Sequence, residues 1–138
     1  MSNINWIDIL GWGEDELEDL RFIAFSYLKQ GMYDIALNFF EALTILTPNN
    51  PYDLQTLGAI YLQKNNALEA LKFLDKALLM DPNHTPSLLN RTKALFLLGY
   101  KKQAFQQAEQ LEKDDDPEIS QQATALILSY IPNTKLPT

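Results

Sequence analysis

Few side chains in this sequence could take part in catalysis or bind a transition metal. The chain has one histidine, His84, and no cysteine. His84 follows Pro82 and Asn83, which are typical turn residues, so we expect its imidazole to be exposed in a turn. A nucleophile pair or a zinc site needs a second histidine or a thiolate. The sequence therefore predicts no catalytic residue.

Positions 114–116 are three consecutive aspartates. Carboxylates suit calcium, but a calcium-binding loop also needs a central glycine and a distal glutamate, which this run lacks. Asp116 stands directly before Pro117, and an aspartate in that position caps a helix. We interpret the run as a linker that ends in a helix cap. The sequence also has no glycine-rich phosphate loop, so we predict no metal and no cofactor.

The composition narrows the classes of partner. The 138 residues carry 11 basic and 18 acidic side chains, a net charge of -7. This balance argues against nucleic acid and against anionic membrane surfaces, which both need a basic face. No apolar run approaches about 20 residues, the length that spans a bilayer. The first residues lack the basic start of a secretory signal. We therefore expect a cytoplasmic protein that does not insert into a membrane.

The elements that would hold a binding site are repeated along the chain, because one set of residues recurs with a period of 34. The set Leu54, Tyr61, Ala70 and Pro82 reappears 34 residues earlier as Leu20, Tyr27, Ala36 and Pro48, and in part 34 residues later as Leu88 and Ala104. A fixed period of this size predicts stacked helix pairs.

The spacing of apolar residues predicts seven helices in one domain at 14–131. Their expected ranges are 14–30, 33–46, 51–63, 67–80, 86–98, 101–113 and 117–131. The first six form repeats at 17–50, 51–84 and 85–116, and the last is a single capping helix. We expect residues 132–138 to form a flexible tail.

Residues 1–13 form a short apolar segment before the repeats. Trp6, Ile9 and Leu10 stand at positions i, i+3 and i+4, a spacing that fits a helical turn or two, and Trp12 follows them. One interpretation is a flap that covers the open end of the first repeat. The other is a self-association surface formed by Trp6, Leu10 and Trp12, because exposed tryptophans are unfavourable in water. A homodimer and a heterodimer both remain open.

The repeated positions resemble the tetratricopeptide repeat. In repeat two they are Leu54, Leu57, Gly58, Tyr61, Ala70, Leu74, Ala77 and Pro82. The small residues, Ala24 or Gly58 on the first helix of a pair, let the second helix approach, and Tyr27 or Tyr61 fills the remaining gap. The resemblance implies an all-α fold of about three tetratricopeptide repeats. These antiparallel helix pairs would form a right-handed superhelix, closed by a C-terminal capping helix.

Residues 20–48 are also similar to the first repeat of bacterial type III secretion chaperones. The shared features are Leu20, Ala24–Phe25, Gly31–Met32–Tyr33 and Phe40–Glu41–Ala42–Leu43. This resemblance implies a non-enzymatic chaperone that keeps a translocator or needle-type component soluble before export. The chain is shorter than that family at both ends. The alternative is a general tetratricopeptide scaffold that joins proteins unrelated to secretion.

In tetratricopeptide domains the first helix of each pair lines a concave groove, and the resemblance places a protein or peptide partner there. The corresponding residues here are Arg21, Phe22, Phe25, Leu28, Tyr52, Gln55, Ala59, Leu62, Lys93, Phe96 and Leu97. Their apolar centre suits a peptide with apolar anchors. The alternative for each residue is a contact with the next repeat or the final helix.

Some repeat domains hold the C-terminal carboxylate of heat-shock chaperones in a clamp of basic residues and asparagines. Arg21 occupies one basic position of that clamp. Phe25 and Thr56 stand where asparagines are needed, and Pro86 stands where a lysine is needed. We therefore expect no carboxylate-tail binding.

Overall fold

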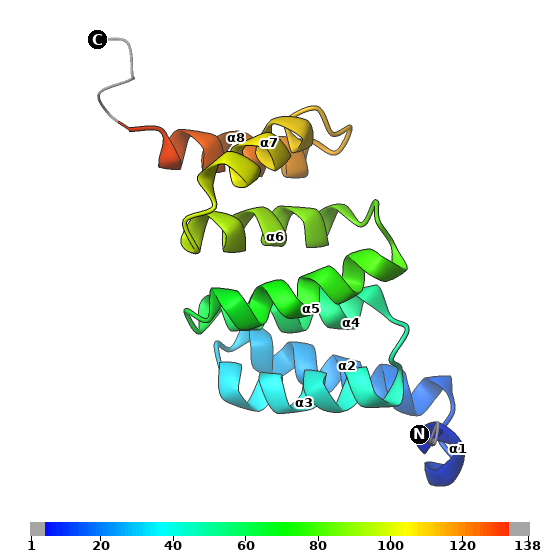
Figure 1. The fold of residues 1–138 in the computed structure, drawn as a ribbon. Helices are drawn as coiled ribbons and strands as arrows, with labels where there is room; N and C mark the ends of the chain where they lie inside the picture. The colour runs from blue at the N-terminus through cyan, green and yellow to red at the C-terminus, as the bar shows by residue number, and fades with distance from the viewer. Residues whose placement is uncertain (1–4, 133–138) are drawn as a thin grey trace.

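The computed structural model describes residues 5–132, and all regular structure within them is helical. Figure 1 shows the helices in chain order as a stack. They are α1 (Trp6–Leu10), α2 (Glu14–Lys29), α3 (Tyr33–Leu46), α4 (Pro51–Gln63), α5 (Ala67–Met80), α6 (Thr85–Leu97), α7 (Lys101–Leu111) and α8 (Pro117–Tyr130). Residues 133–138 of the expected tail, and the first four residues, lie outside the described part.

Local signals explain where the helices begin and end. The side chains of Asn50, Asn66 and Asp116 accept hydrogen bonds from backbone N–H groups in the first turns of α4, α5 and α8. In the turns of the first and third pairs, Gly31 and Gly99 adopt positive φ angles of 75° and 87°, a conformation that glycine adopts without strain, and Asn65 adopts 60° in the turn of the second pair. The expected helix ends agree with the observed ones to within two residues.

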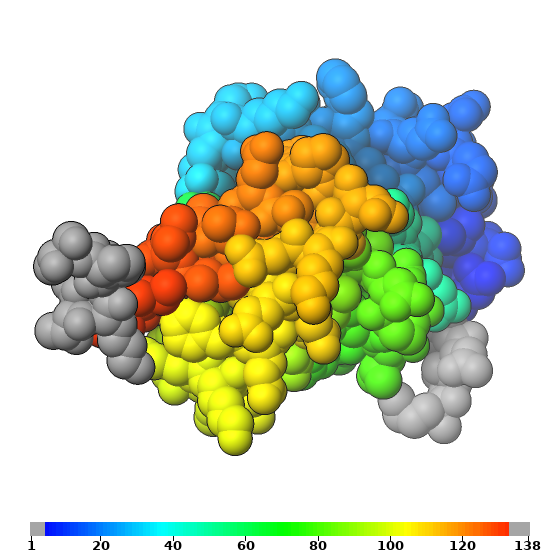
Figure 2. Space-filling view, turned by 90° about the horizontal axis from the view of Figure 1, so that it is seen from above, coloured from blue at the N-terminus to red at the C-terminus, as the bar shows by residue number. Residues whose placement is uncertain are grey.

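The helices form consecutive pairs, α2 with α3, α4 with α5, and α6 with α7, and each pair packs on the next (Figure 1). Seen along the stack, the blue and cyan first pair projects to one side of α7 and α8 (Figure 2). The largest group of buried residues joins the first two pairs. It contains Ala24, Ala36, Phe40, Leu43, Leu57 and Ile60.

The same contact occurs in the first two pairs at positions 34 residues apart. Tyr27 stacks on Phe39 with ring centroids 5.6 Å apart, and Tyr61 stacks on Phe73 at 5.5 Å. The sequence period is thus a period of side-chain packing.

Gly58 explains how closely α4 and α5 approach. A Cβ atom at this position would lie 2.7 Å from Cγ of Leu74, much closer than two carbon atoms can pack. This confirms the expectation that a small residue on the first helix lets the second helix pack against it.

The last helix closes the stack, as expected for a capping helix. Tyr130 of α8 stacks on Phe96 of α6 with ring centroids 4.1 Å apart. In the first half of α8, Ile119 and Ala123 are buried against Leu89 and Leu111. The helix therefore covers apolar surface that α6 and α7 would otherwise expose.

The short helix α1 packs beside α3 at the other end of the stack. It buries none of its residues completely, and Trp6 remains 43% exposed. This arrangement leaves both interpretations of the N-terminal segment open. Within residues 5–132, no helix has the length and apolarity needed to cross a membrane.

Candidate partner-binding groove

The first helices of the pairs enclose a pocket of about 310 Å³, called the central pocket below. It is lined by Leu28, Tyr33, Ala59, Ile60, Leu62, Gln63, Asn90 and Lys93. Four of these, Leu28, Ala59, Leu62 and Lys93, are among the expected groove residues, and they come from α2, α4 and α6. Side chains that are far apart in the sequence therefore line one pocket, because the first helices of the pairs lie next to one another in the stack.

The wall of the central pocket carries one cation, Lys93. Burial lowers the pKa of its ammonium group below the ordinary value for lysine. No carboxylate among residues 5–132 forms an ion pair with it. The pocket thus combines apolar surface with a partly desolvated positive charge.

Arg21 serves the contact between repeats instead of lining the pocket. Its guanidinium donates hydrogen bonds to both carboxylate oxygens of Asp53, at 3.1 and 2.8 Å, and a third to the hydroxyl of Thr47. The hydrogen bond to Asp53 raises the pKa of Arg21, while burial acts in the opposite direction. The positive charge of Arg21 is therefore paired with Asp53 within the protein.

Four further expected groove residues lie outside the central pocket. Phe22 and Tyr52 are 74% and 65% exposed. Phe25 packs edge-on against Phe40, with ring centroids 5.2 Å apart, and remains partly exposed. Gln55 is half-buried on α4. The two phenylalanines offer apolar surface on α2, the helix that also carries Leu28 of the pocket.

Two expected groove residues on α6 are placed differently. Phe96 is only 3% exposed, because Phe105 and Tyr130 cover its ring. Phe96 therefore belongs to the core. This agrees with the alternative stated for each groove residue, a contact with the final helix. Leu97 is exposed but lines a separate hollow with Leu68 and Leu98, beside the turn that precedes α5.

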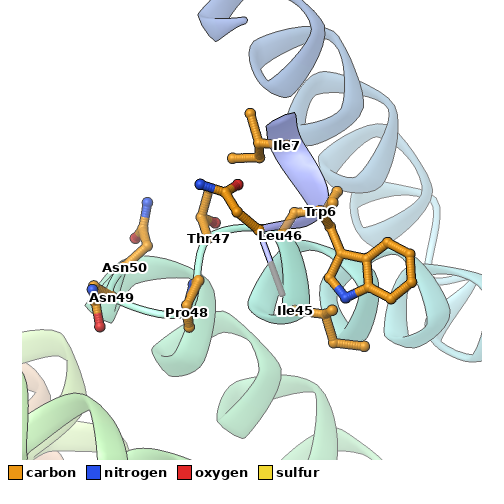
Figure 3. Close-up of a pocket in the computed structure, with 9 residues that line it drawn as sticks. Trp6, Ile7, Ile45, Leu46, Thr47, Pro48, Asn49 and Asn50 are labelled. Atoms are coloured by element: carbon orange, nitrogen blue, oxygen red, sulfur yellow. The ribbon is translucent and has the colours of Figure 1, made fainter. Parts of the chain in front are cut away.

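The expected self-association residues lie on and directly after α1, away from the central pocket. Trp6 lines a pocket of about 550 Å³ between α1 and the end of α3, together with Ile45 and Pro48 (Figure 3). Leu10 is exposed and Trp12 is half-buried, and neither lines this pocket.

Comparison with known proteins agrees with this geometry. Residues 54–84 match the family model of the tetratricopeptide repeat. Anaphase-promoting complex subunit 3 of Schizosaccharomyces pombe is 31% identical to the chain over 86 residues. That match covers 62% of this chain but only 13% of the yeast protein, so the chain spans a small part of that relative's length.

Solved structures match almost the whole chain. The translocator chaperone SycD of Yersinia enterocolitica has a TM-score of 0.79 at 19% identity, covering 93% of this chain and 99% of SycD. PcrH of Pseudomonas aeruginosa, in complex with the chaperone binding region of PopD, has 0.78 at 22% identity, covering 86% and 93%. The first tetratricopeptide domain of Spaghetti, bound to an HSP90 peptide, has 0.72 at 20%, covering 85% and 96%. This is a tetratricopeptide-repeat fold.

The tetratricopeptide framework buries the only histidine, and the expectation that His84 is exposed was wrong. His84 is 5% exposed because Tyr52 packs perpendicular to its ring, with ring centroids 4.6 Å apart. Its Nδ1 lies 2.6 Å from Oγ of Ser87. Burial lowers the pKa of His84, and the nearby Asp81 only partly opposes this. Ser87 is completely buried, so this pair cannot reach a substrate.

The aspartate run lies in the link between the third tetratricopeptide repeat and α8. Asp116 accepts a hydrogen bond from the backbone N–H of Glu118 at 2.9 Å, which confirms its role as a helix cap. Among the residues that the structure describes, no cluster of three or more histidine, cysteine or acidic side chains could hold a metal ion.

Gln63 and Asn90 of the central pocket lie at inward positions of their helices by the repeat register, but the sequence did not indicate Tyr33 and Ile60. Tyr33 begins α3, the second helix of its tetratricopeptide pair, and was therefore not assigned to the groove. Ile60 lies on the packing face of α4 and contributes only an edge to the pocket. Tyr33 directly follows the Gly31–Met32 turn. Its position beside the end of α2 was the one feature of the sequence that could have indicated that it lies near Leu28.

Proposed function

We propose that the chain is a cytoplasmic type III secretion chaperone, which holds an apolar segment of a secreted component in its groove before export. The observation that carries the proposal is the central pocket, formed by the first helices of three tetratricopeptide repeats. Two chaperones match this chain along nearly their full lengths. PcrH, one of the two, was solved with a bound segment of PopD.

The surface supports masking of apolar segments without turnover. Leu28, Ala59 and Leu62 line the central pocket, and the exposed rings of Phe22 and Phe25 extend the apolar surface along α2. Each fully buried anchor of a partner would contribute roughly 1.5–3 kcal/mol, before the free energy needed to order the peptide. Several anchors together would keep an aggregation-prone segment out of water.

A general tetratricopeptide scaffold is the second candidate, and the match to the yeast anaphase-promoting complex subunit favours it. The two candidates differ in the behaviour of the partner. A chaperone's cargo is insoluble alone and soluble in the complex, whereas a scaffold joins partners that are soluble on their own. Binding of heat-shock carboxylate tails is disfavoured further, because Asp53 already engages Arg21.

Co-expression tests the proposal. The chain is produced with each secreted component encoded beside its gene, and the soluble fraction of that component is measured. We expect one component to be soluble only with the chain, and to become insoluble when Phe25→Asp and Leu62→Asp are combined. The matched control combines Leu79→Asp and Leu128→Asp, two exposed positions on α5 and α8. Equal solubility with the groove variant and the control would contradict groove binding.

A further inference from the structure

Lys93 differs from every other lysine in residues 5–132. Lys64 and Lys72 form ion pairs with Asp34 and Glu69. The lysines without an acidic partner are exposed to water, with Lys93 as the exception. These exposed lysines are Lys29, Lys76, Lys101, Lys102 and Lys113. Lys93 is half-buried in the central pocket and has no carboxylate beside it.

The surroundings of Lys93 leave its charge unbalanced. Burial is the cause that lowers the pKa of its ammonium group, and no neighbouring acid offsets it. A partly desolvated charge without a partner is unfavourable, and an anion brought into the pocket would relieve that penalty. Hydrogen bonds to a charged partner in such a site are stronger than those in water.

The remaining polar groups of the pocket are also available. Asn90 and Gln63 line it, and within the described residues neither side chain forms a hydrogen bond. An amide can donate to a carboxylate as well as accept. Ala59 and Leu62 lie in the same pocket, so an acidic group and an apolar group of one peptide would fit together.

We propose that the central pocket is a subsite for an acidic side chain of the bound peptide. The carboxylate of an aspartate or glutamate pairs with Nζ of Lys93, and the apolar residue next to it packs on Ala59 and Leu62. This inference rests on the proposed function, since it names a feature of the segment held in the groove. Lys93 is the one basic side chain that lines the central pocket, so it fixes where along the peptide the acid must lie.

Selection from a random-peptide library displayed on phage tests the subsite without knowledge of the cargo. We expect the wild-type protein to select apolar peptides with an aspartate or glutamate at a constant spacing from an apolar residue. Lys93→Met should still select apolar peptides but lose the acidic preference, and Lys93→Glu should prefer lysine or arginine. Lys102→Met, an exposed lysine on α7, is the matched control and should select as the wild type does.

A second measurement uses one selected peptide and its glutamate-to-glutamine form. The glutamine form should bind the wild-type protein about tenfold more weakly and bind Lys93→Met as tightly as the parent peptide does. This comparison on the wild-type protein decides the question even if Lys93→Met folds poorly.

The outcomes separate the two proposals. If the wild-type protein selects no peptides, or if Leu62→Asp selects the same ones, groove binding fails, and this inference fails with it. If the protein selects apolar peptides without an acidic preference, or if the preference persists in Lys93→Met, only the acidic subsite is overturned.

Discussion

The guanidinium of Arg21 and the carboxylate of Asp53 meet through two hydrogen bonds, at 3.1 and 2.8 Å. Arg21 lies on α2 and Asp53 on α4, and no Cα atom of one helix comes within 8 Å of a Cα atom of the other. The ion pair therefore spans a gap between the first helices of two repeats.

The first prediction concerns this ion pair. Arg21→Met should lower the free energy of unfolding by about 2 kcal/mol, because it leaves the buried carboxylate of Asp53 without its charged partner. Urea denaturation measures this change. The matched control is Arg91→Met, which removes a more exposed pair with Asp75 on neighbouring helices. That change should be no more than about 1 kcal/mol. Equal losses for both variants would show that the link between α2 and α4 has no special role.

The second prediction concerns the close approach of α4 and α5. Gly58→Ala should destabilise the protein by about 1–2 kcal/mol, because the added Cβ meets the side chain of Leu74. The better helix propensity of alanine, about 1 kcal/mol, offsets only part of this cost. A double-mutant cycle in urea checks the cause. Leu74→Ala should be less destabilising in the Gly58→Ala background than in the wild type, and additive effects would contradict the contact.

The third prediction is a pH dependence of stability from the single histidine. Burial lowers the pKa of His84 in the folded state, while the unfolded chain binds a proton near the ordinary value of 6.5. The unfolded state therefore gains protons first as the pH falls, and the free energy of unfolding should decrease from about pH 7 downwards. His84→Gln should flatten this slope between pH 7 and the lowered pKa. Identical slopes in the wild type and the variant, measured by urea denaturation at several pH values, would contradict the burial of His84.

The fourth prediction concerns the closure of the stack by α8. Tyr130→Ala should destabilise the protein by about 2 kcal/mol, because it removes the ring that stacks on Phe96 and exposes that ring to water. Leu128→Ala on the same helix is the control, since Leu128 is largely exposed. It should change stability by less than about 0.5 kcal/mol. Thermal unfolding of both variants shows whether the Tyr130 contact matters more than helix propensity.

The fold could be predicted from the sequence because its determinants are local and repeated. Tyr27 with Phe39 and Tyr61 with Phe73 make one contact twice at the sequence period. Gly58 must be small because Leu74, in the same repeat, packs against it. Caps such as Asn50 and Asp116 act within one helical turn. Each of these features can be recognised without knowledge of distant residues.

The site was harder to predict, since it depends on which neighbour covers each side chain. Phe96 has the spacing of a groove residue, but Tyr130 lies on a helix outside the 34-residue period and covers it. His84 has the sequence context of an exposed turn, but Tyr52 on α4 shields its ring. The repeat pattern does not show which distant side chain covers a given position.

Site-specific photocrosslinking tests groove binding most directly. A photoreactive phenylalanine analogue replaces Leu62 in the central pocket or, as the matched control, Leu79, which is 84% exposed on α5. Each variant is co-expressed with the secreted component that depends on the chain for solubility, and the complex is irradiated. We predict a crosslink from position 62 and none from position 79. A crosslink from position 79 alone would contradict binding in the groove.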